Sequence, residues 1–281
     1  MQAFNDKARA ATRTTRRSSG EPMNLFDLSG RVAVVTGGNG GIGLGMAKAM
    51  AEAGCAISIW ARNADKNRAA EEAIARAGGK VDSLIVDVAD PDSTKAACAA
   101  TLKKHGRIDG CFANAGVGGG GRRAFIDRTE EEWRQMFSVN LDGVFHAFQP
   151  IARHMIERAE AGDKFGRLVA TSSLASMSGT ARNEHYGATK GAINALIRAL
   201  AVEHARYGIT ANAILPGWIR SEMTEGLFAY DKFVANVMPR IPMRRFGEPE
   251  DFGGIAVYLM SKASSYHTGD TLLIDGAYAI F

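Results

Sequence analysis

The sequence predicts one doubly wound α/β domain, in which a parallel sheet of about seven strands carries helices on both faces. Short apolar runs alternate with helical stretches from residue 31 to the end of the chain, a pattern typical of repeated βαβ units. A glycine-rich turn follows the first apolar run, where such domains bind phosphate groups. The chain has 281 residues, 46% of them hydrophobic, which is enough for one large core.

Each predicted strand is a short run of β-branched and other apolar residues that ends at a glycine or a polar turn. Strands that are buried on both faces are expected to be apolar along most of their length, as these runs are. The predicted strands are Arg31–Thr36, Ala56–Trp60, Val81–Val86, Ile108–Ala113, Arg167–Thr171, Thr210–Leu215 and Thr271–Ile274.

Between the strands, small and apolar residues recur at helical spacing. Pro91 suits the first turn of one helix, and Thr129 with Glu132 has the spacing of a capping box. Gly253 and Gly254 fall inside the last helix, where each costs about 1 kcal/mol relative to alanine; we attribute both to close packing. The predicted helices are Gly43–Ala53, Asp65–Ala77, a segment opening at Pro91, Thr129–Arg158, His185–Tyr207 and Pro249–Met260.

The first residues of the chain carry most of its net charge of +4. Residues 1–22 hold five basic and two acidic side chains, a balance of +3 that leaves +1 for the remainder. A nearly neutral globular part argues against a nucleic-acid partner. The segment lacks the apolar core of a secretory signal. It is a disordered tail, an organelle transit peptide, or the product of an upstream start codon with Met23 as the true start. We favour the tail or the misplaced start, and expect a disordered basic extension at 1–24 and a globular domain at 25–281.

The composition also disfavours membrane and zinc proteins. No apolar run approaches the ~20 residues of a membrane span, so no membrane partner is expected. Cys55, Cys98 and Cys111 are odd in number and lack metal-ligand spacing, which predicts no bound metal and a reducing, cytoplasmic location. Each cysteine is expected to be a small buried residue.

The glycine-rich turn spans Thr36–Gly43 and is predicted to cradle a pyrophosphate. Glycines permit the tight turn and let backbone amides approach phosphate oxygens, while the following helix N-terminus favours negative charge. Such a turn alone is a weak signal and could be an ordinary loop. Its place after the first strand of an alternating pattern strengthens the interpretation.

The end of the second strand distinguishes the two nicotinamide dinucleotides. An acidic residue there binds the ribose 2′-hydroxyl of NAD. Here Trp60 is followed by Ala61, Arg62 and Asn63, and an arginine suits a 2′-phosphate. The sequence therefore favours NADP(H) over NAD(H), with a solvated surface arginine as the alternative. Asp87, at the end of the third strand, is predicted to bond the adenine amino group or else to cap a helix.

Tyr186 and Lys190 lie four residues apart, so a helix would bring both side chains to one face. A nearby ammonium favours the phenolate, which predicts a lowered pKa for Tyr186 and proton exchange near neutral pH. Ser173 follows a strand-like run thirteen residues before the tyrosine. With the glycine-rich turn, these residues predict hydride transfer between a nicotinamide cofactor and a carbonyl.

Taken in order along the chain, the motifs resemble those of the short-chain dehydrogenase/reductase family, whose domain is of the Rossmann type. The resemblance extends from about Leu25 to the C-terminus, and its motifs are weak singly but specific together. Two departures are Ala113 in place of a first asparagine and Ala277 in place of a second glycine. The motifs are Thr36-Gly37, Gly41-Ile42-Gly43, Asp87-Val88, Asn114-Ala115-Gly116, Asn140, Ser173, Tyr186 with Lys190, Pro216-Gly217 and Asp275-Gly276.

The resemblance implies a role for each of four catalytic residues. Tyr186 would be the general acid/base, and Lys190 would bind the nicotinamide ribose and lower the pKa of the tyrosine. Ser173 would hydrogen-bond the reacting oxygen, and Asn140 would hold a water linking the lysine to solvent. The predicted cofactor-binding residues are Gly37, Asn39, Gly41, Ile42, Gly43, Arg62, Asp87, Val88, Asn114, Ala115, Gly116, Tyr186, Lys190, Pro216, Gly217, Ile219 and Ser221.

The substrate is left open between several classes. The segment Glu222–Arg245 is predicted to be irregular and mobile, and its apolar side chains either cover the substrate or pack on a neighbouring helix. Arg122 and Arg123 either meet an anionic substrate group or are solvated. His185 either lines the pocket or is a polar residue at a helix start.

The leading prediction is an NADP(H)-dependent carbonyl reductase or alcohol dehydrogenase acting on a small molecule. Within the family, a sugar dehydrogenase of the glucose or gluconate type and a 3-oxoacyl reductase are alternatives. A non-catalytic NAD(P)-sensing regulatory protein is the alternative of another class, and it would be expected to lack a catalytic residue. The resemblance also implies a homotetramer or homodimer, assembled through the helices Thr129–Arg158 and His185–Tyr207 and the region of the C-terminal strand.

Overall fold

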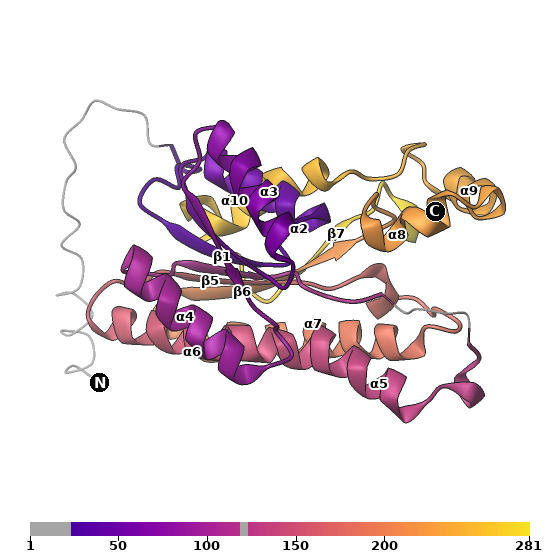
Figure 1. The fold of residues 1–281 in the computed structure, drawn as a ribbon, viewed down its shortest axis with the longest axis horizontal. Coiled ribbons are helices and arrows are strands. Elements are labelled where there is room, and N and C mark those ends of the chain that lie inside the picture. The colour runs from indigo at the N-terminus through magenta and orange to yellow at the C-terminus, as the bar shows by residue number, and fades with distance from the viewer. Residues whose placement is uncertain (1–23, 119–122) are drawn as a thin grey trace, which may run out of the picture.

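Seven parallel strands form one sheet within residues 24–118 and 123–281, the part of the chain that the computed structural model describes. Their order is β3-β2-β1-β4-β5-β6-β7, and helices cover both faces, as predicted (Figure 1). Every predicted strand is present, with bounds that differ by at most two residues. The strands are β1 (Val32–Thr36), β2 (Ala56–Ala61), β3 (Val81–Ile85), β4 (Gly110–Ala113), β5 (Gly166–Thr171), β6 (Ile209–Pro216) and β7 (Thr271–Ile274). The extension predicted at 1–24 lies outside the described residues, apart from Asn24.

The sheet extends in two directions from β1. The chain first adds β2 and β3 on one side, and β4 then returns to the other side of β1, where Ala33 pairs with Gly110. In open α/β sheets a crevice forms where the strand order reverses in this way, outside the carboxyl ends of the strands. Thr36 ends β1 at this edge, and the glycine-rich turn begins immediately after it.

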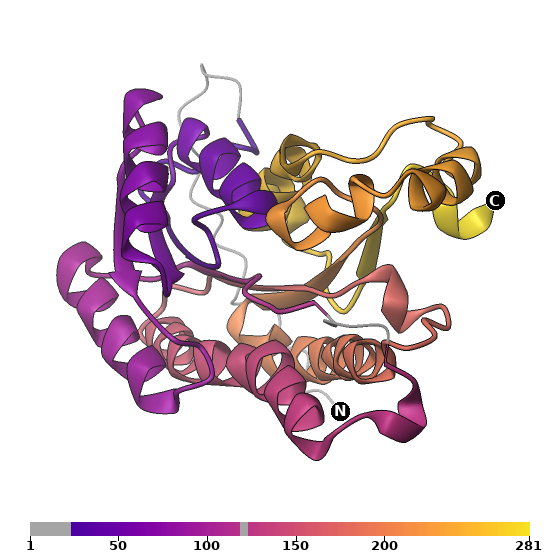
Figure 2. The same cartoon turned by 45° about the vertical axis from the view of Figure 1, so that its right-hand side comes forward.

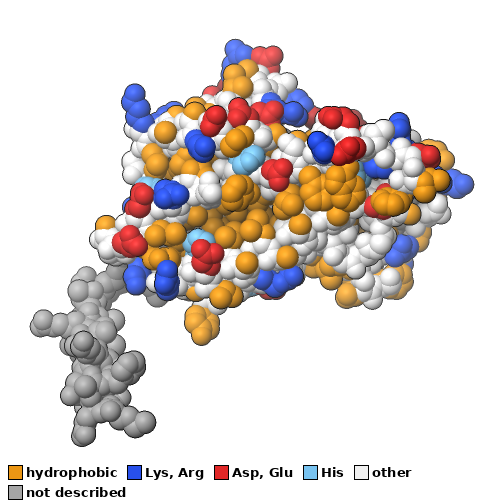
Figure 3. Space-filling model, turned by 90° about the horizontal axis from the view of Figure 1, so that it is seen from below, with side chains coloured by type: hydrophobic (Ala, Val, Ile, Leu, Met, Phe, Trp, Pro, Cys, Tyr) orange, Lys and Arg blue, Asp and Glu red, His pale blue; other side chains and the backbone are white. Residues whose placement is uncertain are grey.

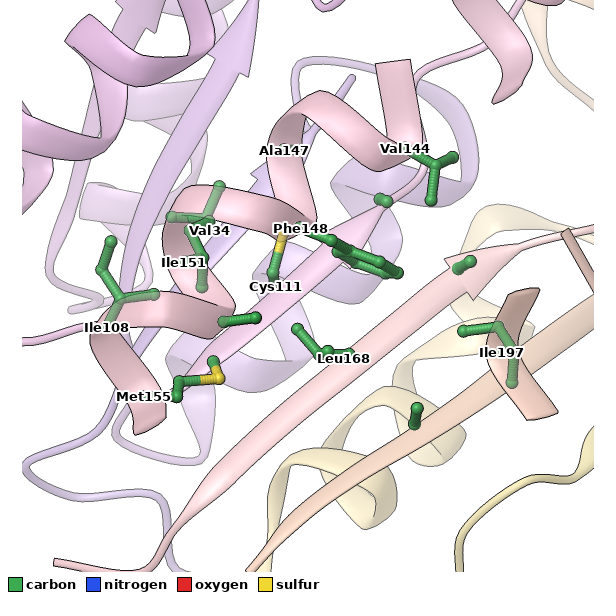
Figure 4. Close-up of a cluster of buried hydrophobic side chains, with 14 of the residues drawn as sticks. Val34, Ile108, Cys111, Val144, Ala147, Phe148, Ile151, Met155, Leu168 and Ile197 are labelled. Carbon is green, nitrogen blue, oxygen red and sulfur yellow. The ribbon is translucent and has the colours of Figure 1, made fainter. Parts of the chain in front are cut away.

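Two layers of helices enclose the sheet (Figures 1 and 2). One face carries α2 (Gly41–Glu52), α3 (Ala64–Arg76) and α10 (Gly253–Met260); the other carries α4 (Pro91–His105), α6 (Gly143–Glu160) and α7 (Glu184–His204). A buried apolar cluster lies under each layer. In Figure 4, Phe148, Ile151 and Met155 of α6 lie against the strands beside Cys111 and Leu168.

The predicted helical stretch Thr129–Arg158 is present from Glu130 to Glu160, with a π-helical turn inside it. Its capping box is confirmed, because Thr129 and Glu132 exchange both side-chain-to-backbone hydrogen bonds. A π-helical turn at Ser138–Asp142 separates α5 (Glu130–Phe137) from α6. Such turns insert an extra residue into the helical ladder and often occur at functional sites. This one carries Asn140.

The segment Glu222–Arg245 is not irregular as predicted, because it contains α8 (Glu222–Phe228) and α9 (Asp231–Val237). Aromatic contacts from outside the segment hold it. The ring centroids of Phe228 and Phe246 lie 4.2 Å apart, and those of Phe233 and Trp218 lie 4.9 Å apart. Phe228 and Phe233 therefore pack on neighbouring structure, whereas Met223 is exposed and lines the cleft.

The last two predicted helices also differ in detail. Pro249–Phe252 is a 3₁₀ turn that precedes α10, and α7 ends at His204 before a 3₁₀ turn at Ala205–Tyr207. Gly253 packs closely, since a Cβ built on it would lie 2.7 Å from the Ala49 Cβ. Gly254 has nothing within 4 Å of such a Cβ, so close packing is the wrong explanation for this glycine.

Two expectations from the composition can be compared with the structure. Cys55, Cys98 and Cys111 are free and buried, as expected of small core residues. Across the described ranges, none of the helices combines the length and apolarity needed to cross a membrane.

Candidate active site

A cleft of about 430 Å³ opens at the carboxyl ends of the central strands, where the strand order reverses. The glycine-rich turn, the end of β2, the loop after β4 and the start of α7 all contribute to its walls. Of the residues predicted from the sequence, all but Gly43 and Asn140 line this cleft. The lining residues among them are Gly37, Asn39, Gly41, Ile42, Arg62, Asp87, Val88, Asn114, Ala115, Gly116, Ser173, Tyr186, Lys190, Pro216, Gly217, Ile219 and Ser221.

The glycine-rich turn fits a bound pyrophosphate. Gly37 has a positive φ of 63°, which favours glycine, and a Cβ on Gly43 would lie 2.3 Å from the Gly37 carbonyl oxygen. Side chains at these positions would separate the two ends of the turn. Gly40 precedes α2 and no side chain caps that helix within the described residues, so its first backbone amides stay available. Free amides at a helix N-terminus form an anion site.

Asn114 and Thr36 tie the loop after β4 to β1. The Thr36 hydroxyl oxygen accepts hydrogen bonds from the backbone amides of Asn114 and Ala115, at 3.0 and 2.9 Å. The Asn114 Nδ2 donates to the Gly37 carbonyl at 3.4 Å, and its Oδ1 accepts from the Thr171 hydroxyl at 3.1 Å. Asn114 therefore lies where predicted, and its side chain braces three strand ends around the cleft.

Ser173, Tyr186 and Lys190 meet at the inner end of the cleft. Ser173 follows β5, and Tyr186 and Lys190 lie one turn apart near the start of α7, as the spacing predicts. Ser173 lies beside Tyr186 and lowers the pKa of the phenol through hydrogen bonding. The Lys190 ammonium lies 5.5 Å from the centre of the tyrosine ring and donates to the Thr171 carbonyl at 2.7 Å.

The predicted lowering of the pKa of Tyr186 is wrong for this structure. Burial raises the pKa of the phenol, and only the hydrogen bond with Ser173 lowers it. Burial also lowers the pKa of Lys190 to about 8. Lys190, whose ammonium lies 5.5 Å from the centre of the phenol ring, does not offset this effect of burial.

Asn140 lies outside the lining of the cleft. Its side chain is buried in the π-helical turn, where Oδ1 accepts from the Val117 amide at 2.8 Å and Nδ2 donates to the Val117 carbonyl at 2.9 Å. The carboxamide therefore anchors the loop after β4. The water-holding role that the resemblance implies for Asn140 stays a prediction.

At the opposite end of the cleft, Arg62 is exposed and has no hydrogen-bond or ion-pair partner among the described residues. Asp87 accepts a hydrogen bond from the Ala89 amide at 3.0 Å. The alternative that Asp87 caps the next helix is wrong, since Asp90 is the residue that caps α4.

Two of the predictions concern side chains beside the substrate, namely His185 and the arginine pair next to the glycine run. His185 is 2% exposed and is absent from the lining of the cleft; burial lowers its pKa. Arg123 lies 3.5 Å from a Glu132 carboxylate oxygen and is exposed, which matches the surface alternative. Arg122 lies outside the described residues.

Comparison with known proteins identifies the family. A family model described as "Enoyl-(Acyl carrier protein) reductase" matches residues 37–279. The gluconate 5-dehydrogenase of Gluconobacter oxydans (strain 621H) is 35% identical over 258 residues, which are 92% of this chain and 98% of that protein. A short-chain type dehydrogenase/reductase from Mycobacterium marinum superposes with a TM-score of 0.84 at 36% identity, over 91% of this chain and 98% of that one. The chain belongs to the short-chain dehydrogenase/reductase family.

As a short-chain dehydrogenase/reductase, the chain is an oxidoreductase that acts on CH–OH or carbonyl groups with NAD(P). One more similar structure is the gluconate 5-dehydrogenase of Burkholderia cenocepacia J2315, in complex with NADP and tartrate. It superposes with a TM-score of 0.85 at 34% identity, over 92% of this chain and 98% of that one.

Sequence reasoning missed several residues of the dehydrogenase cleft. Lys66 lies in the first turn of α3, four residues after Arg62, and this nearness in the chain could have revealed it. Glu222 and Met223 come from α8, and only the folded arrangement brings them to the wall of the cleft. Lys66 and Glu222 form an ion pair that joins α3 to α8 beside the cleft.

Proposed function

We propose that this short-chain dehydrogenase/reductase interconverts a ketone and a secondary alcohol, with Tyr186 as the general acid/base and NADP(H) as the preferred cofactor. The observation that carries the proposal is the meeting of Ser173, Tyr186 and Lys190 in one cleft with the glycine-rich turn. A bound nicotinamide dinucleotide would supply the hydride. The residues of the chain would bind it and manage charge.

In the reducing direction, Tyr186 donates its proton to the oxygen of the carbonyl as negative charge develops there. The raised pKa of the phenol keeps Tyr186 in the donor form at neutral pH. Ser173 stabilises the same oxygen by hydrogen bonding, and the Lys190 charge favours the phenolate that remains. In the oxidising direction, the Tyr186 phenolate takes the proton from the alcohol.

The preference for NADP(H) rests on the adenosine end of the cleft. The end of β2 lacks an acidic residue there and carries Arg62, whose guanidinium is exposed beside the cleft. Lys66 lies on the same wall, where its ammonium is paired with Glu222. A ribose 2′-phosphate would gain charge-assisted hydrogen bonds from the Arg62 guanidinium. The structure of the Burkholderia cenocepacia relative with NADP supports this choice.

The substrate we propose first is a polyhydroxy acid of the gluconate type, because the similar proteins from Gluconobacter and Burkholderia carry that name. A 3-oxoacyl thioester is the second candidate. The apolar Met223, which is 53% exposed at the cleft, favours it.

A substrate panel read by the absorbance of the reduced nicotinamide tests this proposal. Gluconate, 5-ketogluconate, acetoacetyl-CoA and simple ketones are each offered with NADP(H) and with NAD(H). We expect turnover of the sugar acid pair, with a higher kcat/KM for NADP(H). If only acetoacetyl-CoA is turned over, the sugar acid proposal is wrong and the substrate is an acyl thioester. An equal or higher kcat/KM with NAD(H) would contradict the cofactor preference.

A further inference from the structure

Asn67 is a buried asparagine on the inner face of α3 that none of the roles above accounts for. It is 2% exposed, and it shares this face with Ala70 and Ile74. Asparagine is a poor helix former, and burial of an amide is costly unless its polar atoms are bonded. An apolar residue would fill the position at lower cost, so the contacts of the Asn67 side chain call for an explanation.

The contacts of Asn67 join three parts of the adenosine end of the cleft. Its Nδ2 donates to the carbonyl of Ala61 at the end of β2, at 2.9 Å, and to the carbonyl of Leu84 in β3, at 3.3 Å. Its Oδ1 accepts from the Nδ2 of Asn39 in the glycine-rich turn, at 2.7 Å. One side chain therefore links two strand ends to the turn that faces the pyrophosphate.

Hydrogen-bond chemistry fixes the orientation of both amides. The carbonyl oxygens of Ala61 and Leu84 can only accept, so the Asn67 group that faces them must be its NH₂. Its oxygen then faces Asn39 and can only accept, so Asn39 must present its own NH₂. Asn39 keeps one N–H and its oxygen for the cleft that it lines.

We propose that Asn67 is a positioning residue for the dinucleotide, which sets the orientation of Asn39 and holds the glycine-rich turn against the ends of β2 and β3. It acts on the part common to NADP(H) and NAD(H), because its partners are the turn and the strand ends and not Arg62. The proposal rests on the proposed function only in taking this cleft as the dinucleotide site.

The test measures equilibrium binding of NADPH and NADH, by fluorescence titration, to Asn67→Leu and to the wild-type protein. Leucine keeps the size of the side chain and removes the donors and the acceptor. We expect both dissociation constants to rise by about tenfold, the effect of leaving buried polar groups unpaired. Arg62→Ala, in contrast, should weaken NADPH more than NADH. Wild-type affinity of Asn67→Leu for both dinucleotides would overturn the proposal.

A matched control separates positioning from general destabilisation. Asn212 on β6 is 1% exposed, and its amide joins the His267 carbonyl at 2.9 Å and the Asp270 amide at 3.1 Å, outside the lining of the cleft. Asn212→Leu should lower Tm by a similar amount and leave both dissociation constants unchanged. All titrations are made well below the Tm of every variant. An equal loss of affinity in Asn212→Leu would reduce Asn67 to a purely structural role.

A double substitution tests whether Asn67 acts through Asn39. In an Asn39→Ala background, Asn67→Leu should weaken binding by much less than tenfold, since the two changes remove one linkage. If the losses of affinity caused by the two single substitutions multiply in the double variant, Asn67 does not act through Asn39. If Asn67→Leu does not fold, Asn67→Asp replaces it, because a carboxylate would face two carbonyl oxygens and should weaken both dinucleotides. If the wild-type protein binds neither dinucleotide, the proposed function fails; if it binds both and the variants match it, only this inference fails.

Discussion

Tyr186 and Lys190 are both held where charge is unfavourable. Burial raises the pKa of the phenol and lowers that of the amine to about 8. The spacing of the two residues could be predicted from the sequence, because an i, i+4 pair on a helix needs no tertiary information. The direction of the pKa shift of Tyr186 could not, because it depends on how deeply the folded chain buries the phenol.

These two shifts predict the pH dependence of carbonyl reduction. Because the pKa of Lys190 lies near 8, its ammonium loses its charge as the pH rises through that value, while Tyr186 keeps its proton. We expect kcat/KM for reduction to fall between about pH 7 and pH 9. In Lys190→Arg the residual activity should begin to decline only at a higher pH than in the wild type, since a guanidinium stays charged. A flat wild-type profile across this range would contradict the role given to the lysine charge.

Among the elements, the strands follow from the sequence and the interruptions of helices do not. Parallel strands buried on both faces are apolar runs, which is why β1 and β6 agree with prediction to within one residue. The helical stretch Thr129–Arg158 is present as predicted, but the π-helical turn at Ser138–Asp142 inside it was not predicted. The helices α8 and α9 are too short for a periodic pattern, and contacts with Trp218 and Phe246 stabilise them.

Helix α10 offers a prediction from two adjacent glycines. A Cβ on Gly253 would lie 2.7 Å from the Ala49 Cβ of α2, whereas a Cβ on Gly254 would meet nothing within 4 Å. Gly254→Ala should stabilise the protein by up to about 1 kcal/mol through helix propensity. Gly253→Ala should destabilise it because α10 must move away from α2. Urea unfolding measures both, and a stabilising Gly253→Ala would refute the close packing.

A buried carboxylate joins distant segments of the chain at the edge of the sheet opposite the cleft. The side chain of Asp109 is fully buried at the start of β4 and pairs with Arg31, Arg107 and Arg158. Burial raises its pKa, but the hydrogen bond from Arg107 and the nearby charges outweigh this, so the pKa is lowered overall. The pairing joins segments far apart in the chain, so no local pattern of residues predicts it.

Asp109 should therefore contribute to stability at neutral pH. Its folded pKa lies below the unfolded value of about 3.9, so its contribution is present above that value and is lost as the pH falls through the folded pKa. Asp109→Asn should cost about 3 kcal/mol at pH 7, since Arg31 loses its carboxylate partner and Arg107 and Arg158 keep only Asp163. It should also reduce the loss of stability below about pH 4. Asp65→Asn, at a carboxylate that is 90% exposed, should cost less than about 0.5 kcal/mol; equal losses in the two variants would contradict this account.

The face formed by α6 and α7 predicts self-association. Figure 3 shows apolar side chains gathered across the face that carries these helices, and a groove of about 510 Å³ there is lined by Phe145, Phe148, Leu196 and Leu200, among others. Phe145 is 48% exposed. An apolar patch of this kind is typical of an interface, and the family resemblance implies a dimer or tetramer.

Light scattering tests this assembly. We expect the wild-type protein to have the molar mass of a dimer or tetramer. Phe145→Glu should shift the mass toward that of the monomer, because the carboxylate would be buried without a partner. Ile85→Glu, at a residue that is 70% exposed at the end of β3, should leave the mass unchanged. A monomeric wild-type protein would remove the prediction.

The central claim is that the Tyr186 hydroxyl transfers the proton in the reaction of this cleft. The most direct measurement compares turnover and NADPH binding in Tyr186→Phe, with Tyr207→Phe, at the end of the same helical segment, as the control. The account predicts that Tyr186→Phe loses two to four orders of magnitude, roughly, in kcat. Its dissociation constant for NADPH should stay near the wild-type value, and Tyr207→Phe should match the wild type in both. Near-normal turnover in Tyr186→Phe would contradict the account.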